Sequence, residues 1–250
     1  MMQLARQQLS ALQEELRDIE ETEAEMAKAK IMKHVDALQS ILGSAKKLFE
    51  AGARMTLNAI LLTFADISLD MKEKYPVAIF PNMQIASSDG VLVKNPVNQF
   101  EVWLTGNVDY GVCTYKDEAN RARVLEAPLG DLMTYIENCI ILVEAKRDKE
   151  MFIDSMPEAT SQAIALSEVT GINTVRYCLS DGTKWMFHVY TSDGQGNRVS
   201  YEGPIVTIAQ PHLEVGEDFK KDVRRVVELL YHWLRTDVDI KDDPLCTLRV

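Results

Sequence analysis

The chain of 250 residues has no long hydrophobic run. Its longest apolar stretch, residues 57–67, is interrupted by Thr63 and Asp66 and is shorter than the roughly 20 residues needed to span a bilayer. The first residues show no apolar core followed by a cleavage site, so we expect no secretory signal. These absences predict an intracellular protein, cytoplasmic or nuclear, with no membrane partner.

Cysteine and histidine are scarce, at four residues each, and neither type has the spacing of a zinc site. The cysteines form no CxxC pair, and three of them, Cys113, Cys139 and Cys178, lie in apolar or strand-like stretches. We therefore expect free thiols in a reducing compartment and no zinc.

Positive charge is also in deficit, with a formal net charge of −11. This balance disfavours a protein that coats nucleic acid non-specifically. It is compatible with an enzyme that binds nucleic acid locally and neutralises its carboxylates with a divalent metal. Hydrophobic residues make up 46% of the chain, which is enough for a sizeable core.

The N-terminal 50 residues have the periodicity of helices. One apolar stripe runs from Leu9 to Ile19, and a second begins at Ile31 with a shifted phase. A lone amphipathic helix is marginal in water, so the stripes need either the chain's own core or a second copy. We favour a homodimer through these helices. The seven acids of residues 14–25 by themselves favour a solvated helix face, with an oligomerisation arm as the alternative.

The rest of the chain alternates between helix and strand patterns. Ser88-Asp89-Gly90 predicts a turn between strands, and residues 116–128 are loop-like. Gly52 is expected to interrupt the helical pattern, and Gly171 fits the position just past a helix end. The predicted helices cover residues 55–71, 157–170 and 217–235; the predicted strands cover 84–87, 91–94, 100–115 (long or broken), 139–145, 174–179, 184–190 and 198–202.

A carboxylate and an ammonium group appear abruptly at the end of the apolar strand 139–145. Strand alternation puts Glu144 and Lys146 on one face and Ala145 on the other. Phosphodiester hydrolysis requires an oriented water and neutralisation of charge on the transition state. Asp109 and Glu144 on neighbouring strands, with the Ala145 carbonyl, could hold Mg²⁺ or Mn²⁺, while Lys146 acts on the water.

Asp109 followed by Glu144-Ala145-Lys146 resembles the D…ExK signature of PD-(D/E)XK nucleases. The resemblance implies an α/β fold with a restriction-endonuclease-like αβββαβ core and a mixed central sheet. It also implies a Mg²⁺- or Mn²⁺-dependent nuclease acting on DNA or RNA. The core would span 52–210, between an N-terminal helical extension (1–51) and a C-terminal helix that packs on the core (211–250).

Two further features enter through this resemblance. Gln162 follows Lys146 on the next helix, where several branches of the superfamily carry a glutamine near the metal. The hairpin sequence of residues 180–187 is similar to that of some fungal and bacterial members. The family's first acidic motif has three candidates, Glu50, Asn58 and Asp66.

Each of these residues also has an ordinary structural alternative. Asp109 could serve a turn or a cap, Glu144 and Lys146 a surface ion pair, and Gln162 a solvated helix face. Two other functional hypotheses stay open: an inactive protein of the same fold that acts as a protein or nucleic-acid interaction module, and a helical scaffold with an incidental sheet. The basic residues of 217–235 are either a nucleic-acid contact or a solvated face.

Overall fold

The computed structural model describes residues 50–70, 76–86, 89–95, 99–115, 118–132, 135–146, 150–193, 197–208 and 217–234, together with Ala29 and Lys33, which are helical. The rest of the predicted N-terminal helices, and the homodimer expected from them, lie outside the described residues.

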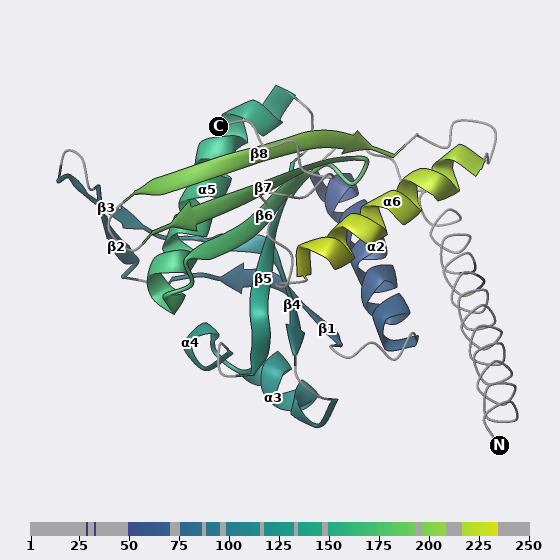
Figure 1. The fold of residues 1–250 in the computed structure, drawn as a ribbon, viewed down its shortest axis with the longest axis horizontal. Coiled ribbons are helices and arrows are strands. Elements are labelled where there is room, and N and C mark those ends of the chain that lie inside the picture. Colours follow the sequence, from purple (N-terminus) through teal and green to yellow (C-terminus); the bar gives the residue numbers. More distant parts are fainter. Residues whose placement is uncertain are drawn as a thin grey trace, which may run out of the picture.

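A six-stranded mixed sheet organises the protein (Figure 1). The order of its strands is β1-β4-β5-β6-β7-β8, in which β5 and β6 are parallel and every other neighbouring pair is antiparallel. The fold is therefore α/β. The strands are β1 (Val77–Gln84), β4 (Asn107–Tyr115), β5 (Ile136–Ala145), β6 (Thr174–Ser180), β7 (Lys184–Ser192) and β8 (Arg198–Thr207).

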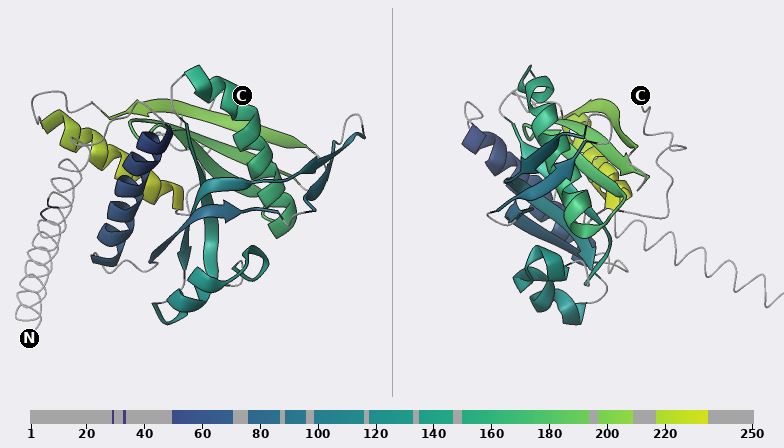
Figure 2. Two further views of the ribbon diagram at one scale, coloured as in Figure 1. Left: turned by 180° about the vertical axis from the view of Figure 1, so that it is seen from behind. Right: turned by 90° about the vertical axis from the view of Figure 1, so that its left-hand side faces the viewer.

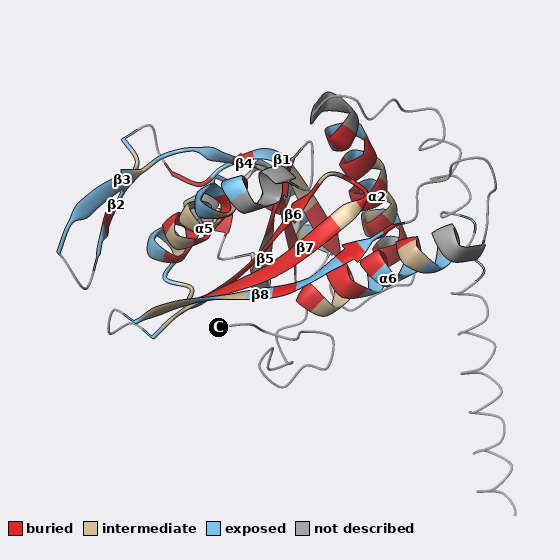
Figure 3. Ribbon diagram, turned by 90° about the horizontal axis from the view of Figure 1, so that it is seen from above, coloured by how far each residue is buried: buried red, intermediate tan, exposed pale blue. Residues whose placement is uncertain are grey.

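Helices cover both faces of this sheet. One face packs against α2 (Glu50–Asp70) and α6 (Glu217–Leu234), in a core that includes Phe64, Phe187 and Trp233. The other packs against α5 (Glu150–Thr170), with Ala163 and Leu166 in the core, and against α3 (Arg121–Glu126) and α4 (Leu129–Leu132). The buried stripes of the helices face the strands in Figure 3. Burial on two faces explains the apolar middle of β5, where Leu142 lies in one core and Val143 in the other.

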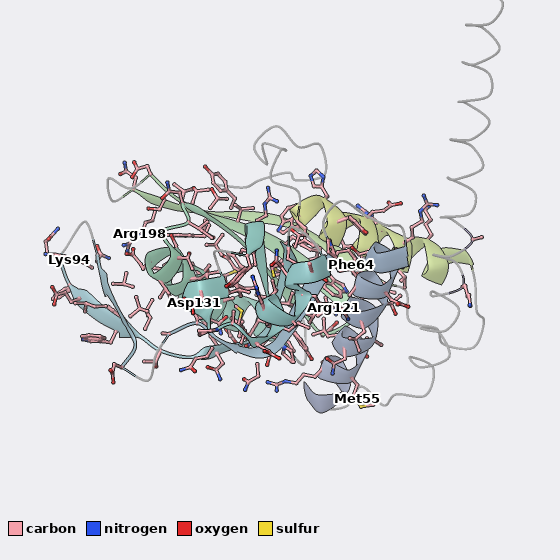
Figure 4. The ribbon with its side chains drawn as sticks, turned by 90° about the horizontal axis from the view of Figure 1, so that it is seen from below. Met55, Phe64, Lys94, Arg121, Asp131 and Arg198 are labelled. Carbon is pink, nitrogen blue, oxygen red and sulfur yellow. The ribbon has the colours of Figure 1, made fainter. Side chains whose placement is uncertain are left out.

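A two-stranded ribbon, β2 (Val91–Lys94) and β3 (Glu101–Leu104), projects from the body of the protein (Figure 2). Lys94 lies on this ribbon, far from Met55 and Phe64 on α2 (Figure 4). The ribbon corrects one prediction. Residues 91–94 were expected to pair with 84–87, but β2 pairs with β3, while the end of β1 pairs with β4 through Gln84 and Asn107.

Most predicted elements are confirmed. The β6–β7 hairpin forms around Gly182, whose φ is +84°, and α5 ends one residue before Gly171, whose φ is +72°. Three predictions were wrong in detail. Gly52 lies inside α2, α5 begins at Glu150 rather than at 157, and the predicted loop 116–128 contains η1 (Glu118–Asn120) and α3.

Other predictions can be compared with the described residues. Cys113 and Cys178 are buried free thiols. Lys221, Arg224 and Arg225 on α6 are exposed, as the sequence pattern predicts. Within the described part of the chain, no helix has the length and apolar character required to cross a membrane. The central six-stranded sheet excludes the hypothesis of a helical scaffold with an incidental sheet.

Candidate active site

The candidate residues gather at one end of the sheet, where β5 finishes and β4 starts. The antiparallel pairing of these strands runs as far as Tyr110 opposite Val143, so Asp109 and Glu144 are the next residues outward. On its other side β5 runs parallel to β6, and the main-chain N–H of Lys146 donates to the carbonyl of Ser180 over 2.8 Å. Ligands of open α/β sheets commonly bind at such carboxyl ends of strands.

Beyond Tyr110 and Val143, hydrogen bonds from main chain to side chain connect β4 and β5. Asp109 Oδ2 accepts a hydrogen bond from the N–H of Ala145 at 2.7 Å, and Glu144 Oε2 accepts one from the N–H of Asp109 at 3.4 Å. Each carboxylate is therefore held against the main chain of the opposite strand. The N–H and C=O of one strand residue point to the same side, so the Ala145 carbonyl is also directed toward β4.

Lys146 lies between two glutamates. Its Nζ is 3.1 Å from Glu144 Oε1 and 2.8 Å from Glu158 Oε2, on the first half of α5. The Lys146 side chain is 14% exposed and that of Glu144 is 10% exposed, so this is not a surface ion pair. The two glutamates hold the ammonium group between the end of β5 and α5.

Gln162 lies one helical turn after Glu158 and contacts both β4 and β5. Its Nε2 donates to Glu144 Oε2 at 3.3 Å and to the main-chain carbonyl of Asn107 at 3.2 Å. The side chain is partly exposed, and both of its hydrogen bonds are to residues of β4 and β5. Gln162 fixes the Glu144 carboxylate relative to the start of β4.

Arg54, on α2, completes the site on the side opposite α5. Its Nη2 lies 2.5 Å from Asp109 Oδ1, and its main-chain carbonyl accepts a hydrogen bond from the Tyr110 hydroxyl at 3.3 Å. Sequence reasoning missed both Arg54 and Glu158. Neither belongs to the D…ExK pattern, and only the fold brings them to Asp109 and Lys146.

Burial and clustered charge shift the pKa values at the site. Burial raises the pKa of Glu144 above its ordinary value, and the negative charge of Asp109 raises it further, against the opposing effect of Lys146. For Lys146, burial lowers the pKa, but hydrogen bonds and charge from Glu158 and Glu144 outweigh burial and raise it. Such perturbed groups are concentrated at functional sites.

The oxygen-rich part of the site fits a hard divalent cation. The Asp109 and Glu144 carboxylates and the Ala145 carbonyl are the ligand types that Mg²⁺ and Mn²⁺ prefer. The raised pKa of Glu144 also favours a cation at this site, because a positive charge there would reduce the repulsion between Glu144 and Asp109. Among the described residues, no group of three or more His, Cys, Asp or Glu side chains is placed to hold a metal ion. The remaining ligands of a cation at this site would therefore be main-chain carbonyls or water.

The structure thus brings together Asp109, Glu144, Ala145, Lys146 and Gln162, all of which the sequence singled out. Asp109 lies inside β4, which excludes a turn as its role. The α2 residue that pairs with Asp109 is the cation Arg54, which is not among the candidates for the family's first acidic motif, Glu50, Asn58 and Asp66.

Comparison with models of known protein families and with curated proteins gives no match to this chain.

Proposed function

We propose that this protein is a metal-dependent nuclease of the PD-(D/E)XK type that hydrolyses phosphodiester bonds in DNA or RNA. The observation that carries the proposal is the contact set around Glu144: Asp109 from the neighbouring strand, Lys146 from just past the end of the same strand, and Gln162 from the following helix. Four residues, separated by up to 53 positions, meet at one strand end and provide carboxylates and an ammonium group that metal-assisted hydrolysis can use.

The order of the elements supports the same proposal. Helix α2, strands β1, β4 and β5, helix α5 and strand β6 come in the order αβββαβ. Two insertions interrupt this order: the β2–β3 ribbon after β1, and the short helices η1, α3 and α4 between β4 and β5. The resemblance implies this αβββαβ order for residues 52–210, so the order supports a restriction-endonuclease-like core. Helix α6 then packs on the sheet beside α2, as expected of a C-terminal extension on the core.

Asp109, Glu144 and the Ala145 carbonyl would hold Mg²⁺ or Mn²⁺. A bound cation of this kind supplies neutralisation of phosphate charge and a more acidic water. Lys146 orients the attacking water and stabilises negative charge that develops at phosphorus. Gln162 keeps the Glu144 carboxylate in place, and Glu158 keeps the Lys146 ammonium directed into the site.

A Mn²⁺-dependent cleavage assay on single- and double-stranded DNA and RNA tests the proposal. Lys146→Ala should lower the cleavage rate by ~10²–10⁴-fold while leaving Mn²⁺ affinity nearly unchanged, because an ammonium group is not a ligand. Glu144→Ala removes a ligand, so excess Mn²⁺ should partly restore its activity but not that of Lys146→Ala. A Lys146→Ala protein that cleaves as fast as wild type would refute the assignment.

Metal binding itself can be tested without a substrate. A ligand that binds only the folded state raises stability by about 2.7 kcal/mol at 100 times its Kd, so Mn²⁺ should raise the melting temperature of wild type. The double variant Asp109→Ala/Glu144→Ala should show no such rise. An equal rise in both proteins would place the metal elsewhere.

The second candidate is an inactive protein of the same fold that acts as an interaction module. The β2–β3 ribbon favours it, because Leu92, Val102 and Trp103 on these strands and the adjoining Phe100 are exposed large hydrophobic residues. Exposed apolar clusters of this kind are common at binding surfaces. A protein that binds nucleic acid or a protein partner, but neither binds Mn²⁺ nor cleaves, would favour this candidate.

A further inference from the structure

Arg54 places a second cation at the site, on the side that Lys146 does not reach. Its guanidinium Nη2 is 2.5 Å from Asp109 Oδ1, while Lys146 Nζ contacts Glu144 and Glu158. The D…ExK pattern assigns no role to this arginine. An arginine permanently paired with Asp109 would compete with Mg²⁺ or Mn²⁺ for the same carboxylate.

The two oxygens of Asp109 are held in different ways. Oδ2 takes the N–H of Ala145 at 2.7 Å, a bond to the neighbouring main chain that the fold fixes. Oδ1 takes Arg54, whose side chain is 49% exposed and can reorient without disturbing the core. The Asp109–Arg54 pair is therefore the contact that can exchange when another cation arrives.

The main chain of Arg54 is anchored even though its side chain is not. The Tyr110 hydroxyl donates to the Arg54 carbonyl at 3.3 Å, and Tyr110 directly follows Asp109 in β4. The same helical turn abuts the β6–β7 hairpin, where a Cβ on Gly182 would lie 3.3 Å from the carbonyl of Ala53 and 2.5 Å from Thr56 Cγ2. The guanidinium is thus kept within reach of Asp109 by a rigid attachment.

We infer that Arg54 is a phosphate-binding residue that pairs with Asp109 in the metal-free protein and turns to the substrate phosphate when the divalent cation binds. This inference rests on the proposed function. A cation ligated by Asp109 would repel a guanidinium on the same carboxylate, and the released group would lie close to a phosphate held by that cation. Arginine suits this task because its planar fork matches two phosphate oxygens at once.

Calorimetric titrations of Mn²⁺, and of inorganic phosphate into Mn²⁺-saturated protein, test the inference without any turnover. Arg54→Ala should bind Mn²⁺ more tightly than wild type, by roughly 3- to 10-fold, because a part-exposed competing ion pair has been removed. The same variant should bind phosphate on the order of 10-fold more weakly. Arg54→Lys keeps the charge but not the fork, so its Mn²⁺ affinity should stay near that of wild type while phosphate binding is weakened.

Arg224→Ala is the matched control. Arg224 is 51% exposed and pairs with Glu228 at 2.7 Å on α6, so its loss removes a comparable surface ion pair away from the site. Both of its affinities should equal those of wild type. Circular dichroism melts verify that each variant is folded.

The outcomes separate the two proposals. An Arg54→Ala protein that binds Mn²⁺ no more tightly than wild type, or binds phosphate equally well, overturns the role of Arg54 and leaves the nuclease proposal standing. A wild-type protein that binds no Mn²⁺ overturns both. Tighter Mn²⁺ binding with weaker phosphate binding, in Arg54→Ala but not in Arg224→Ala, supports the inference.

Discussion

The main-chain N–H of Asp109 donates a hydrogen bond to the carboxylate of Glu144, with 3.4 Å between the nitrogen and Oε2. This contact puts one acid against the backbone of another at the end of two paired strands. The arrangement has a cost when both groups are ionised, since burial and the charge of Asp109 raise the pKa of Glu144 above its ordinary value of 4.5.

A pH dependence of stability follows from this shift. A carboxyl with a raised folded-state pKa binds its proton more tightly in the folded protein than in the unfolded chain. Its stabilising contribution is complete below about 4.5 and is lost as the pH rises through the raised value. Metal-free wild type should therefore lose stability relative to Glu144→Gln over that interval, as measured by urea unfolding at a series of pH values.

Glu168, a glutamate on α5, provides the control for this measurement. Glu168 pairs with Arg198 at 2.7 Å on the second half of the helix and is 38% exposed, so Glu168→Gln removes an exposed carboxylate away from the site. The same unfolding series on Glu168→Gln gives the effect of losing a carboxylate that does not contact Asp109. A difference between wild type and Glu144→Gln that does not vary with pH would show that Glu144 is not strained.

Gly182 should be far less tolerant of alanine than Gly171. Both have positive φ, +84° and +72°, so an alanine at either position is strained by roughly 1–2 kcal/mol. Only at Gly182 would the new Cβ collide, at 2.5 Å from Thr56 Cγ2; at Gly171 nothing in the described structure lies within 4 Å. Gly182→Ala should cost about 1–3 kcal/mol more of unfolding free energy than Gly171→Ala.

Denaturant unfolding of the two glycine variants measures this difference. Since Thr56 follows Arg54 on the same turn of α2, Gly182→Ala should also disturb the Asp109 contact and change Mn²⁺ affinity. Equal losses of stability in the two variants would mean that the helix and the hairpin are not packed as closely as the structure has them.

The N-terminal helices remain a prediction about association. Their two apolar stripes need a partner, and we favour a second copy of the chain over the chain's own core. Light scattering should then give a dimer for the full chain and a monomer for residues 51–250. A full chain that is monomeric would rule out the homodimer.

Local sequence patterns predicted the elements that build the site. The apolar run before Glu144, the helical stripe around Ala163 and the turn at Gly182 each depend on neighbours in sequence, and all three formed where expected. Strand partners do not depend on neighbours alone. The Ser88-Asp89-Gly90 turn predicts pairing of 84–87 with 91–94, but long-range contacts take the end of β1 to β4 instead.

The same limit explains the residues that sequence reasoning missed. Arg54 lies 55 positions before Asp109, on a helix whose local pattern marks it only as solvent-facing. Its place at the site is set by how α2 packs on the sheet. Glu158 is one turn from Gln162 on α5, so once Gln162 was singled out, helical spacing could have identified it.

Glu158 should tune the lysine rather than take part in metal binding. Its Oε2 is 2.8 Å from Lys146 Nζ, and its side chain is 56% exposed. Burial lowers the pKa of Lys146, but the hydrogen bond from Glu158, together with Glu144, raises it above the ordinary value of 10.5. Glu158→Gln keeps the side-chain size and removes the charge, so the pKa of Lys146 should fall.

The measurement is the pH profile of the cleavage rate in wild type, Glu158→Gln and Glu168→Gln. If the protonated Lys146 is the working form, the alkaline limb of Glu158→Gln should move to lower pH, while that of Glu168→Gln stays with wild type. Near neutral pH the loss of rate should be far smaller than the ~10²–10⁴-fold expected of Lys146→Ala, because the ammonium is still present. NMR of the reductively methylated lysines follows the same titration without substrate. Alkaline limbs that coincide in wild type and Glu158→Gln, with an unmoved Lys146 signal, would show that the 2.8 Å contact does not control the lysine.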